Sequence, residues 1–216
     1  MTDLYGMIYR GQSGLSGGGN TFDPRQVMLN TLGEQIVMDW LQKAVMDGSV
    51  FQVRAGTITT PITGQVDVTD AASEMSADAA SGTTIMPVRI NVDIEALGGT
   101  LPNITAKSVA TVSSAGTAFV PLALRSDGPA AISTARAQTA GNVVVTAELA
   151  TTTLRHLSLT QSAIGDPAGH QVIQLIPAPV LVGARCFYIQ VGTVTTGSSY
   201  WASFEYVEYD STLVAR

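Results

Sequence analysis

The stretch RINVDIEAL (residues 89–97) alternates between polar and apolar side chains from Arg89 to Ala96, and it decides the fold class. An extended chain places alternate residues on opposite faces, so this pattern is typical of a β-strand with one face in a core and one in solvent. The sequence therefore predicts a strand here. Its apolar face carries Ile90, Val92 and Ile94, and its polar face carries Asn91, Asp93 and Glu95.

The same period of two recurs along the chain after residue 48, in segments that are rich in Val, Ile and Thr and bounded by Gly, Pro, Asn or Asp. No second helical pattern of comparable strength follows, and no repeat of fixed period is visible. We therefore expect residues 49–216 to form a mainly β domain, an antiparallel β-sandwich of jelly-roll type. The predicted strands are SVFQVRAGTITT, GQVDVT, TIMPVRINVDIEA, ITAKSVATVSS, TAFVPLALRS, NVVVTAELA, TLRHLSLT, HQVIQLIPA, RCFYIQVGTVT and YWASFEYVEYD.

Two long connections interrupt this pattern. Residues 70–83 (DAASEMSADAASGT) are acidic and small, which predicts an exposed long loop or a short helix, and residues 126–141 have turn residues at both ends. Calcium takes six to eight oxygen ligands, often from loops, but the EF-hand pattern is absent. A solvated acidic loop is the preferred interpretation, and calcium binding is left open. The carboxylates concerned are Asp67, Asp70, Glu74 and Asp78.

The N-terminal part of the chain predicts an arm followed by one helix. Residues 1–22 are rich in Gly and Ser, as extended arms are, and such a segment orders only where a partner holds it. Residues 23–48 predict an amphipathic α-helix: Asp23 can cap it, Pro24 suits its first position, and Gly48 can end it.

The arm contains GLSGG (residues 14–18), which fits the G-x-S-x-G pattern with Ser16 at its centre. A nucleophile elbow needs a strand before the serine and a helix after it, on a parallel sheet, and the predicted strands do not supply that context. No lysine follows the glycines, so a phosphate-binding loop is excluded as well. His156 and His170 lie fourteen residues apart without a metal-ligand spacing. We expect no enzyme, no cofactor and no metal site, with calcium at residues 70–83 the one question left open.

The charge pattern argues against direct nucleic-acid binding. The net charge is −6, only two residues are lysine, and the nine arginines are scattered singly, whereas binding to phosphates needs clustered cations. The longest apolar run (residues 176–184) contains two prolines and is too short to span a membrane. The first ten residues lack the basic cluster and apolar core of a secretion signal, so the chain is expected to be made in the cytoplasm.

Aromatic and aliphatic residues of the arm, together with one tryptophan, are the candidate partner-binding residues. In YWASFEYVEYD the second face of the predicted strand carries Trp201, which packs either in the core or against another subunit. The candidates are Tyr5, Ile8, Tyr9, Leu15 and Trp201.

An arm, a short amphipathic helix and a long run of Thr-, Val- and Ala-rich strands together resemble the single jelly-roll structural proteins of virus and bacteriophage particles. The resemblance covers most of the chain, with residues 1–20 and 50–209 carrying it. It implies a capsid shell, minor capsid or cement (decoration) subunit, located in the virion and bound to copies of itself, trimers included, and to other capsid proteins.

One departure from that pattern concerns the arm, in which Arg10 is the only cation. Many small-virus shell proteins carry a basic arm that meets the genome, so this arm favours an outer or cementing role. The alternative function is a receptor- or glycan-binding β-sandwich module of a fibre or tail. An exposed aromatic cleft or a calcium site would distinguish that module from an assembly subunit.

Overall fold

The computed structural model describes residues 39–57, 59–64, 72–96, 102–138, 143–145, 151–158, 170–192 and 197–211, with the backbone alone for residues 151–158. The chain divides into two compact units, Met1–Lys43 and Ala44–Arg216. The described residues of the second unit are mainly β, and their strands pair antiparallel. The predicted mainly β, antiparallel class is confirmed.

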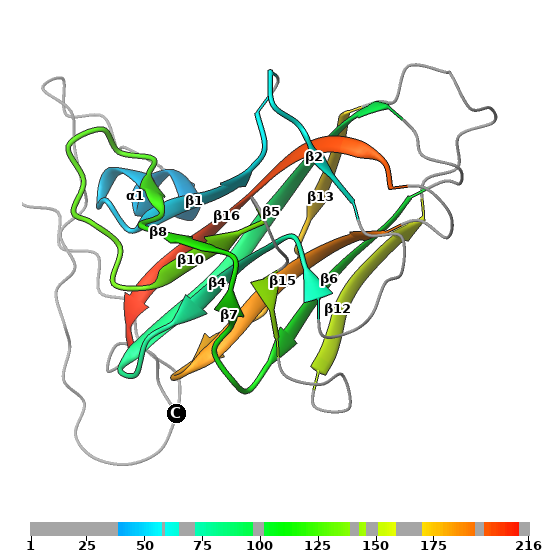
Figure 1. Ribbon diagram of the computed structural model, residues 1–216. Helices are drawn as coiled ribbons and strands as arrows, with labels where there is room; N and C mark the ends of the chain where they lie inside the picture. The colour runs from blue at the N-terminus through cyan, green and yellow to red at the C-terminus, as the bar shows by residue number, and fades with distance from the viewer. Residues whose placement is uncertain are drawn as a thin grey trace, which may run out of the picture. The chain divides into compact units, whose positions relative to one another are not determined.

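The first sheet has the strand order β13-β5-β16-β1-β9, and two short strands, β14 and β2, pair with β5 and β16. The long strand β16 lies between β5 and β1 (Figure 1). Val53 of β1 lies opposite Phe204 of β16, and Phe204 lies opposite Ile90 of β5, so one face of this sheet is apolar. Its strands are β1 (Val50–Ala55), β2 (Ile62–Thr63), β5 (Thr83–Ala96), β9 (Leu122–Ala123), β13 (His170–Gln174), β14 (Leu181–Val182) and β16 (Ser199–Asp210).

The second sheet has the order β12-β6-β15-β4-β10-β8, with β15 between β6 and β4 (Figure 1). Its strands are β4 (Met75–Ala79), β6 (Asn103–Val109), β8 (Thr117–Phe119), β10 (Thr134–Ala137), β12 (Thr151–Ser158) and β15 (Arg185–Gly192). A third, small sheet joins β3 (Ala72–Ser73), β11 (Val143–Val144) and β7 (Ser114–Ala115) in the order β3-β11-β7.

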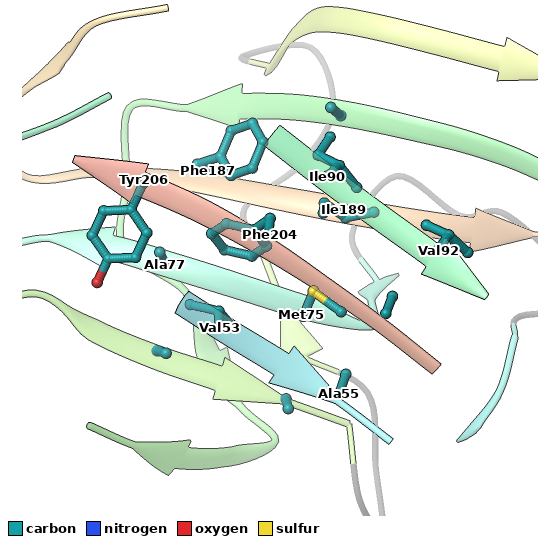
Figure 2. Close-up of a cluster of buried hydrophobic side chains, with 14 of the residues drawn as sticks. Val53, Ala55, Met75, Ala77, Ile90, Val92, Phe187, Ile189, Phe204 and Tyr206 are labelled. Carbon is teal, nitrogen blue, oxygen red and sulfur yellow. The ribbon is translucent and has the colours of Figure 1, made fainter. Parts of the chain in front are cut away.

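The main core consists of apolar side chains that the first two sheets direct toward each other (Figure 2). The rings of Phe187 on β15 and Phe204 on β16 meet edge to face, with their centroids 5.0 Å apart and their planes at 74°. Phe204 also lies 6.1 Å from the ring of Tyr206. The alternation predicted for residues 90–94 is confirmed, because Ile90, Val92 and Ile94 are buried while Asn91 and Asp93 are half-buried. In β16 the predicted core face is buried, but the opposite face is covered as well from Ser203 to Val207.

One helix, α1 (Trp40–Met46), is described. Asp39 accepts a hydrogen bond from the N–H of Leu41 at 2.8 Å and so caps its first turn. Gly48 has φ of 75°, a left-handed conformation that glycine adopts without strain, and its N–H donates to the carbonyl of Val45. Gly48 thus ends the helix as predicted. Residues 23–38 of the predicted helix and the arm (residues 1–22) lie outside the described residues.

The expectation of an exposed acidic loop at residues 70–83 is wrong for the described part. Residues 72–79 supply β3 and β4, and all five residues of β4 are buried. β4 lies inside the second sheet between β15 and β10, so Ala77 packs in the core while Asp78 points to the other, covered face. Small side chains in this stretch allow close packing on both faces, whereas composition alone makes them look like loop residues.

Residues 126–141 also contain a strand that the sequence pattern did not indicate, β10, which pairs with β4 and β8. The single strand predicted over TAFVPLALRS is instead two, β8 and β9, and they belong to different sheets. Pro121 lies between them, and proline has no N–H to donate to a ladder. The break lets the chain cross from one sheet to the other.

Candidate functional site: an aromatic groove beside an open strand edge

A groove of about 640 Å³ lies where the ends of β1 and β16 meet β8 and β10. This volume falls within the range of roughly 300–1,000 Å³ that is usual for ligand pockets. Segments far apart in sequence build it, because β1 belongs to the first sheet and β8 and β10 to the second. Its described lining residues are Arg54, Ala55, Gly56, Thr57, Thr117, Phe119, Ala137, Gln138 and Trp201.

The backbone at Gly56 brings Trp201 close to the end of β1. Gly56 has φ of 71°, and a Cβ at this position would lie 3.3 Å from the Cβ of Trp201 and 3.2 Å from the carbonyl oxygen of Tyr200. The chain then turns back through Thr57 and Thr60, which exchange backbone hydrogen bonds of 2.9 and 3.1 Å. Glycine therefore permits the close approach that sets the indole against this turn.

No described strand covers the edge of β1 beside the groove, which is called the open edge of β1. The carbonyl of Val50 accepts a hydrogen bond from the N–H of Leu124, so the even-numbered residues of β1 direct their backbone groups toward β9. β9 pairs with β1 only as far as Gln52, because Pro121 precedes it. The N–H and C=O of Arg54, two residues further on, face the same side beyond the end of β9, and no described strand pairs with them there.

Polar groups in the groove also lack partners. The Arg54 side chain is exposed, it carries the only charge among the described lining residues, and no described carboxylate pairs with it. Oε1 of Gln138 is buried and accepts no hydrogen bond from any described residue. Trp201 and Phe119 are half-buried and add two aromatic surfaces. The groove thus offers a cation, a strand edge and two rings.

A buried polar cluster on the covered face of the second sheet is the nearest approach to a nucleophile site among the described side chains. Ser113 donates its N–H to Oδ1 of Asp78 at 2.8 Å and its hydroxyl to Oδ2 at 2.6 Å, and Cys186 lies beside them. Both Cys186 and Ser113 are closed to solvent, and burial, then the charge of Asp78, raises the pKa of the thiol. These groups hold the segment around Ser113 onto the sheet.

The buried thiol gives a direct prediction. At pH 8 we expect a thiol-reactive dye to label Cys186 at least about tenfold more slowly in the native protein than in guanidinium, where the thiol regains a pKa of roughly 8.5. Because the chain has a single cysteine, the labelled fraction measured by mass spectrometry reports this site alone. Equal labelling rates in the two conditions would contradict the burial.

A second buried carboxylate, that of Glu208 on β16, holds the segment before β10. Its Oε1 accepts the N–H of Ile132 at 2.8 Å, and its Oε2 accepts the N–H of Ser133 at 2.9 Å and the Ser133 hydroxyl. Ser133 Oγ lies 2.6 Å from the hydroxyl of Tyr206, which acts as donor because the Ser133 proton is directed at Glu208. Burial raises the pKa of Tyr206, which keeps this hydroxyl protonated.

Two sets of exposed apolar side chains, named patches, come from segments at opposite edges of the first sheet. The first, the β9 patch, lies at the β9 edge, and its most exposed members are Ile132, 68% exposed, and Val120, 66% exposed. The second, the β14 patch, lies at the β13 edge, where β13 and β14 both pair with β5, and its Ile176 is 75% exposed. The β9 patch consists of Val120, Leu122, Leu124 and Ile132, and the β14 patch consists of Val172, Ile176, Val180 and Val182.

Of the partner-binding candidates from the sequence, the structure describes only Trp201, which lines the groove, half-buried on the face of β16 opposite the core. Tyr5, Ile8, Tyr9 and Leu15 lie outside the described residues, as does Ser16 of the G-x-S-x-G pattern. His170 lies at the start of β13 with its Nδ1 2.6 Å from Oδ1 of Asp93. The sequence pattern did not indicate Arg54, Phe119 or Gln138 as site residues.

Comparisons with protein-family models, with curated proteins and with solved structures found no match for this chain. Over the described ranges, no group of three or more His, Cys, Asp or Glu side chains could hold a metal ion. The part of the chain that the structure describes contains no helix with both the length and the hydropathy of a membrane span.

Proposed function

We propose that this chain is a structural subunit of a virus or bacteriophage particle, serving as a capsid shell, minor capsid or cement (decoration) protein. The observation that carries the proposal is the pair of exposed apolar patches at opposite edges of one sheet. Contiguous exposed apolar surface marks sites of protein–protein contact. Two different patches on opposite edges suit head-to-tail contacts between copies, which close into rings or shells when the rotation allows.

The finer fold that we propose is a jelly roll. A hairpin of eight strands that rolls into two sheets pairs its first strand with its eighth, its second with its seventh, its third with its sixth and its fourth with its fifth. The long strands, taken in chain order, support this topology: β1 pairs with β16, β4 with β15, β5 with β13 and β6 with β12. Pairing of β16 with β5 and of β15 with β6 adds the remaining contacts.

The proposed partners are other copies of this chain, trimers included, and other capsid proteins, in the virion. We propose that residues 1–20 lie across a neighbouring copy, with Tyr5, Ile8, Tyr9 and Leu15 as anchors. Ordering such a segment costs about 1–2 kcal/mol per residue, which these side chains and backbone hydrogen bonds would offset. The net charge of −6 disfavours direct contact with nucleic acid, and we propose no catalytic role.

The patches and the arm predict a specific assembly defect. Val120→Asp and Ile176→Asp, each in the full chain, are expected to weaken self-association at least roughly tenfold, because each places a charge in an apolar contact. Deletion of residues 1–20 is expected to leave the sandwich folded and to impair assembly in the same way. Sedimentation velocity and electron micrographs of the purified variants measure both effects.

The controls make the head-to-tail arrangement testable. Val112→Asp changes an exposed valine outside both patches and should leave assembly unchanged. All three substitutions are at exposed positions, so the free energy of unfolding, measured by thermal melting, should stay within about 0.5 kcal/mol of the wild-type value. Mixing the Val120→Asp and Ile176→Asp chains should yield discrete heterodimers, since each retains the patch that the other lacks. A wild-type chain that stays monomeric at high concentration would refute the structural role.

A second candidate function rests on the groove. A receptor- or glycan-binding module needs an exposed aromatic cleft, and Trp201 with Phe119 and Arg54 supplies one. Such a module would bind its ligand without large-scale assembly. A glycan screen on the full chain, with Trp201→Ala as the negative control, separates this candidate from the assembly subunit.

A further inference from the structure

We propose that the groove beside β1 is the docking site for residues 3–5 (Asp-Leu-Tyr) of a neighbouring copy, which add as a short strand to the open edge of β1. This inference rests on the proposed assembly function and names the surface that receives the arm. Three features of the groove lead to it: the edge of β1 that no described strand covers, the cation without a described carboxylate partner, and the two rings.

The open edge of β1 indicates that the occupant of the groove is an extended segment of chain. Backbone N–H and C=O groups at a strand edge bind another extended segment through main-chain hydrogen bonds, while side-chain pockets supply specificity. The N–H and C=O of Arg54 lie beyond the end of β9 and face the groove side.

The charge of Arg54 and the rings of Trp201 and Phe119 indicate which side chains that segment should carry. Arg54 has no described carboxylate partner and the described lining holds no acid, so a carboxylate on the incoming segment would complete a charge pair. Trp201 and Phe119 offer apolar ring surface, which favours an aromatic side chain near that carboxylate. The expected motif is therefore an acid and an aromatic residue close together, without proline.

The chain itself contains that motif at few places. Among residues outside the described ranges, the aromatic ones are Tyr5, Tyr9 and Phe22. Tyr9 is followed by the cation Arg10, and Phe22 is followed by Asp23-Pro24, where the proline lacks an N–H. Asp3-Leu4-Tyr5 keeps every N–H and places the acid two residues from the ring. It is the segment that fits.

The test is a charge exchange in the full chain. Arg54→Glu alone and Asp3→Lys alone should each weaken self-association roughly tenfold, and the double variant should return to within about threefold of the wild type, since the pair is restored with its sign reversed. Arg185→Glu is the matched control, because Arg185 is also exposed and has no described partner. It should leave association unchanged.

A peptide titration tests the groove directly. The receptor is the full-length chain with Asp3→Lys, which weakens its own arm, and Trp40→Phe, which leaves Trp201 as the only tryptophan. An acetylated peptide of residues 1–10 should change the Trp201 emission saturably, and a peptide with Asp3→Lys should bind at least roughly tenfold more weakly. A scrambled peptide should not bind.

Each outcome decides between the two proposals. If the patch variants disrupt assembly while the charge exchange and the peptide have no effect, the assembly function stands and the docking inference is overturned. If the chain never assembles yet the peptide binds in the groove, the inference about the groove holds and the assembly function fails. Absence of peptide binding together with saccharide binding that Trp201→Ala abolishes would overturn the inference in favour of the glycan-binding module.

Discussion

Phe204→Ala is expected to lower the free energy of unfolding by about 3–5 kcal/mol, the range measured for phenylalanines removed from packed cores. Phe204 is fully buried at the middle of β16, the strand that joins β1 to β5. Its ring meets Phe187 of the opposite sheet edge to face and lies near Tyr206 on its own strand. Truncation removes contacts between the sheets and leaves a cavity that rigid strands cannot close.

Denaturant titration and thermal melting measure this loss, which corresponds to a fall of roughly 6–20 °C in the unfolding midpoint for a domain of this size. Phe204→Leu should lose less, because it refills part of the volume. Val172→Ala, at an exposed position on the edge strand β13, should change stability by no more than about 0.5 kcal/mol. A loss below about 1 kcal/mol for Phe204→Ala would contradict a core shared by the two sheets.

Strands with one face in the core and one face toward solvent could be predicted from the sequence, because apolar and polar residues then alternate along the strand. β5 is the example, since Ile90 faces the core whereas Asn91 faces away. In β16, Phe204 faces the core as predicted, but Ser203 and Glu205 on the opposite face are buried too, which the pattern did not indicate. The mainly β class followed from such segments alone. Which strands pair is a property of the whole chain, and β1 lies beside β16, its partner at the far end of the sequence.

β4 could not be predicted by the same reasoning, because both of its faces are buried and its residues are small. Met75, Ala77 and Ala79 pack in the core, while Ser76 and Asp78 are covered on the other face. Carboxylates are usually found in solvent, so the acidic composition of this stretch suggested a loop. The two hydrogen bonds that Ser113 donates reduce the cost of burying the Asp78 carboxylate. Ser113 lies 35 residues away in sequence, so the local pattern around Asp78 does not indicate it as the partner.

The groove could be predicted only in part. The sequence pattern indicates Trp201, on the second face of an aromatic strand, as either a core or an interface residue, and the structure places it half-buried in the groove lining. Arg54, Phe119 and Gln138 come from three other strand ends and carry no local signature. The early end of β9 at Pro121 is visible in the sequence, but its consequence, an open edge at Arg54, needs the pairing of β9 with β1.

Glu208→Ala is expected to destabilise the protein by about 3–5 kcal/mol, because it leaves the N–H groups of Ile132 and Ser133 and the buried Ser133 hydroxyl without their acceptor. Glu208→Gln retains one acceptor oxygen but presents an amide donor where the other stood, so roughly half of that loss is expected. The matched control is Glu95→Gln, because the carboxylate of Glu95 is exposed near the end of β5. Its free energy of unfolding should stay within about 0.5 kcal/mol of the wild-type value.

Amide hydrogen exchange distinguishes a local loss of the hydrogen bonds between Glu208 and residues 132–133 from a general loss of stability. In the wild type the amides of Ile132 and Ser133 should exchange slowly, and in Glu208→Gln these two should lose protection first, while β16 amides such as that of Phe204 keep theirs. Unchanged protection at Ile132 and Ser133 would show that Glu208 does not hold this segment. Loss of this hydrogen bond also affects an exposed surface. Ile132 is a 68% exposed member of the β9 patch, and the buried carboxylate of Glu208 holds its backbone. Loosening that backbone should weaken self-association without changing any residue of the patch itself.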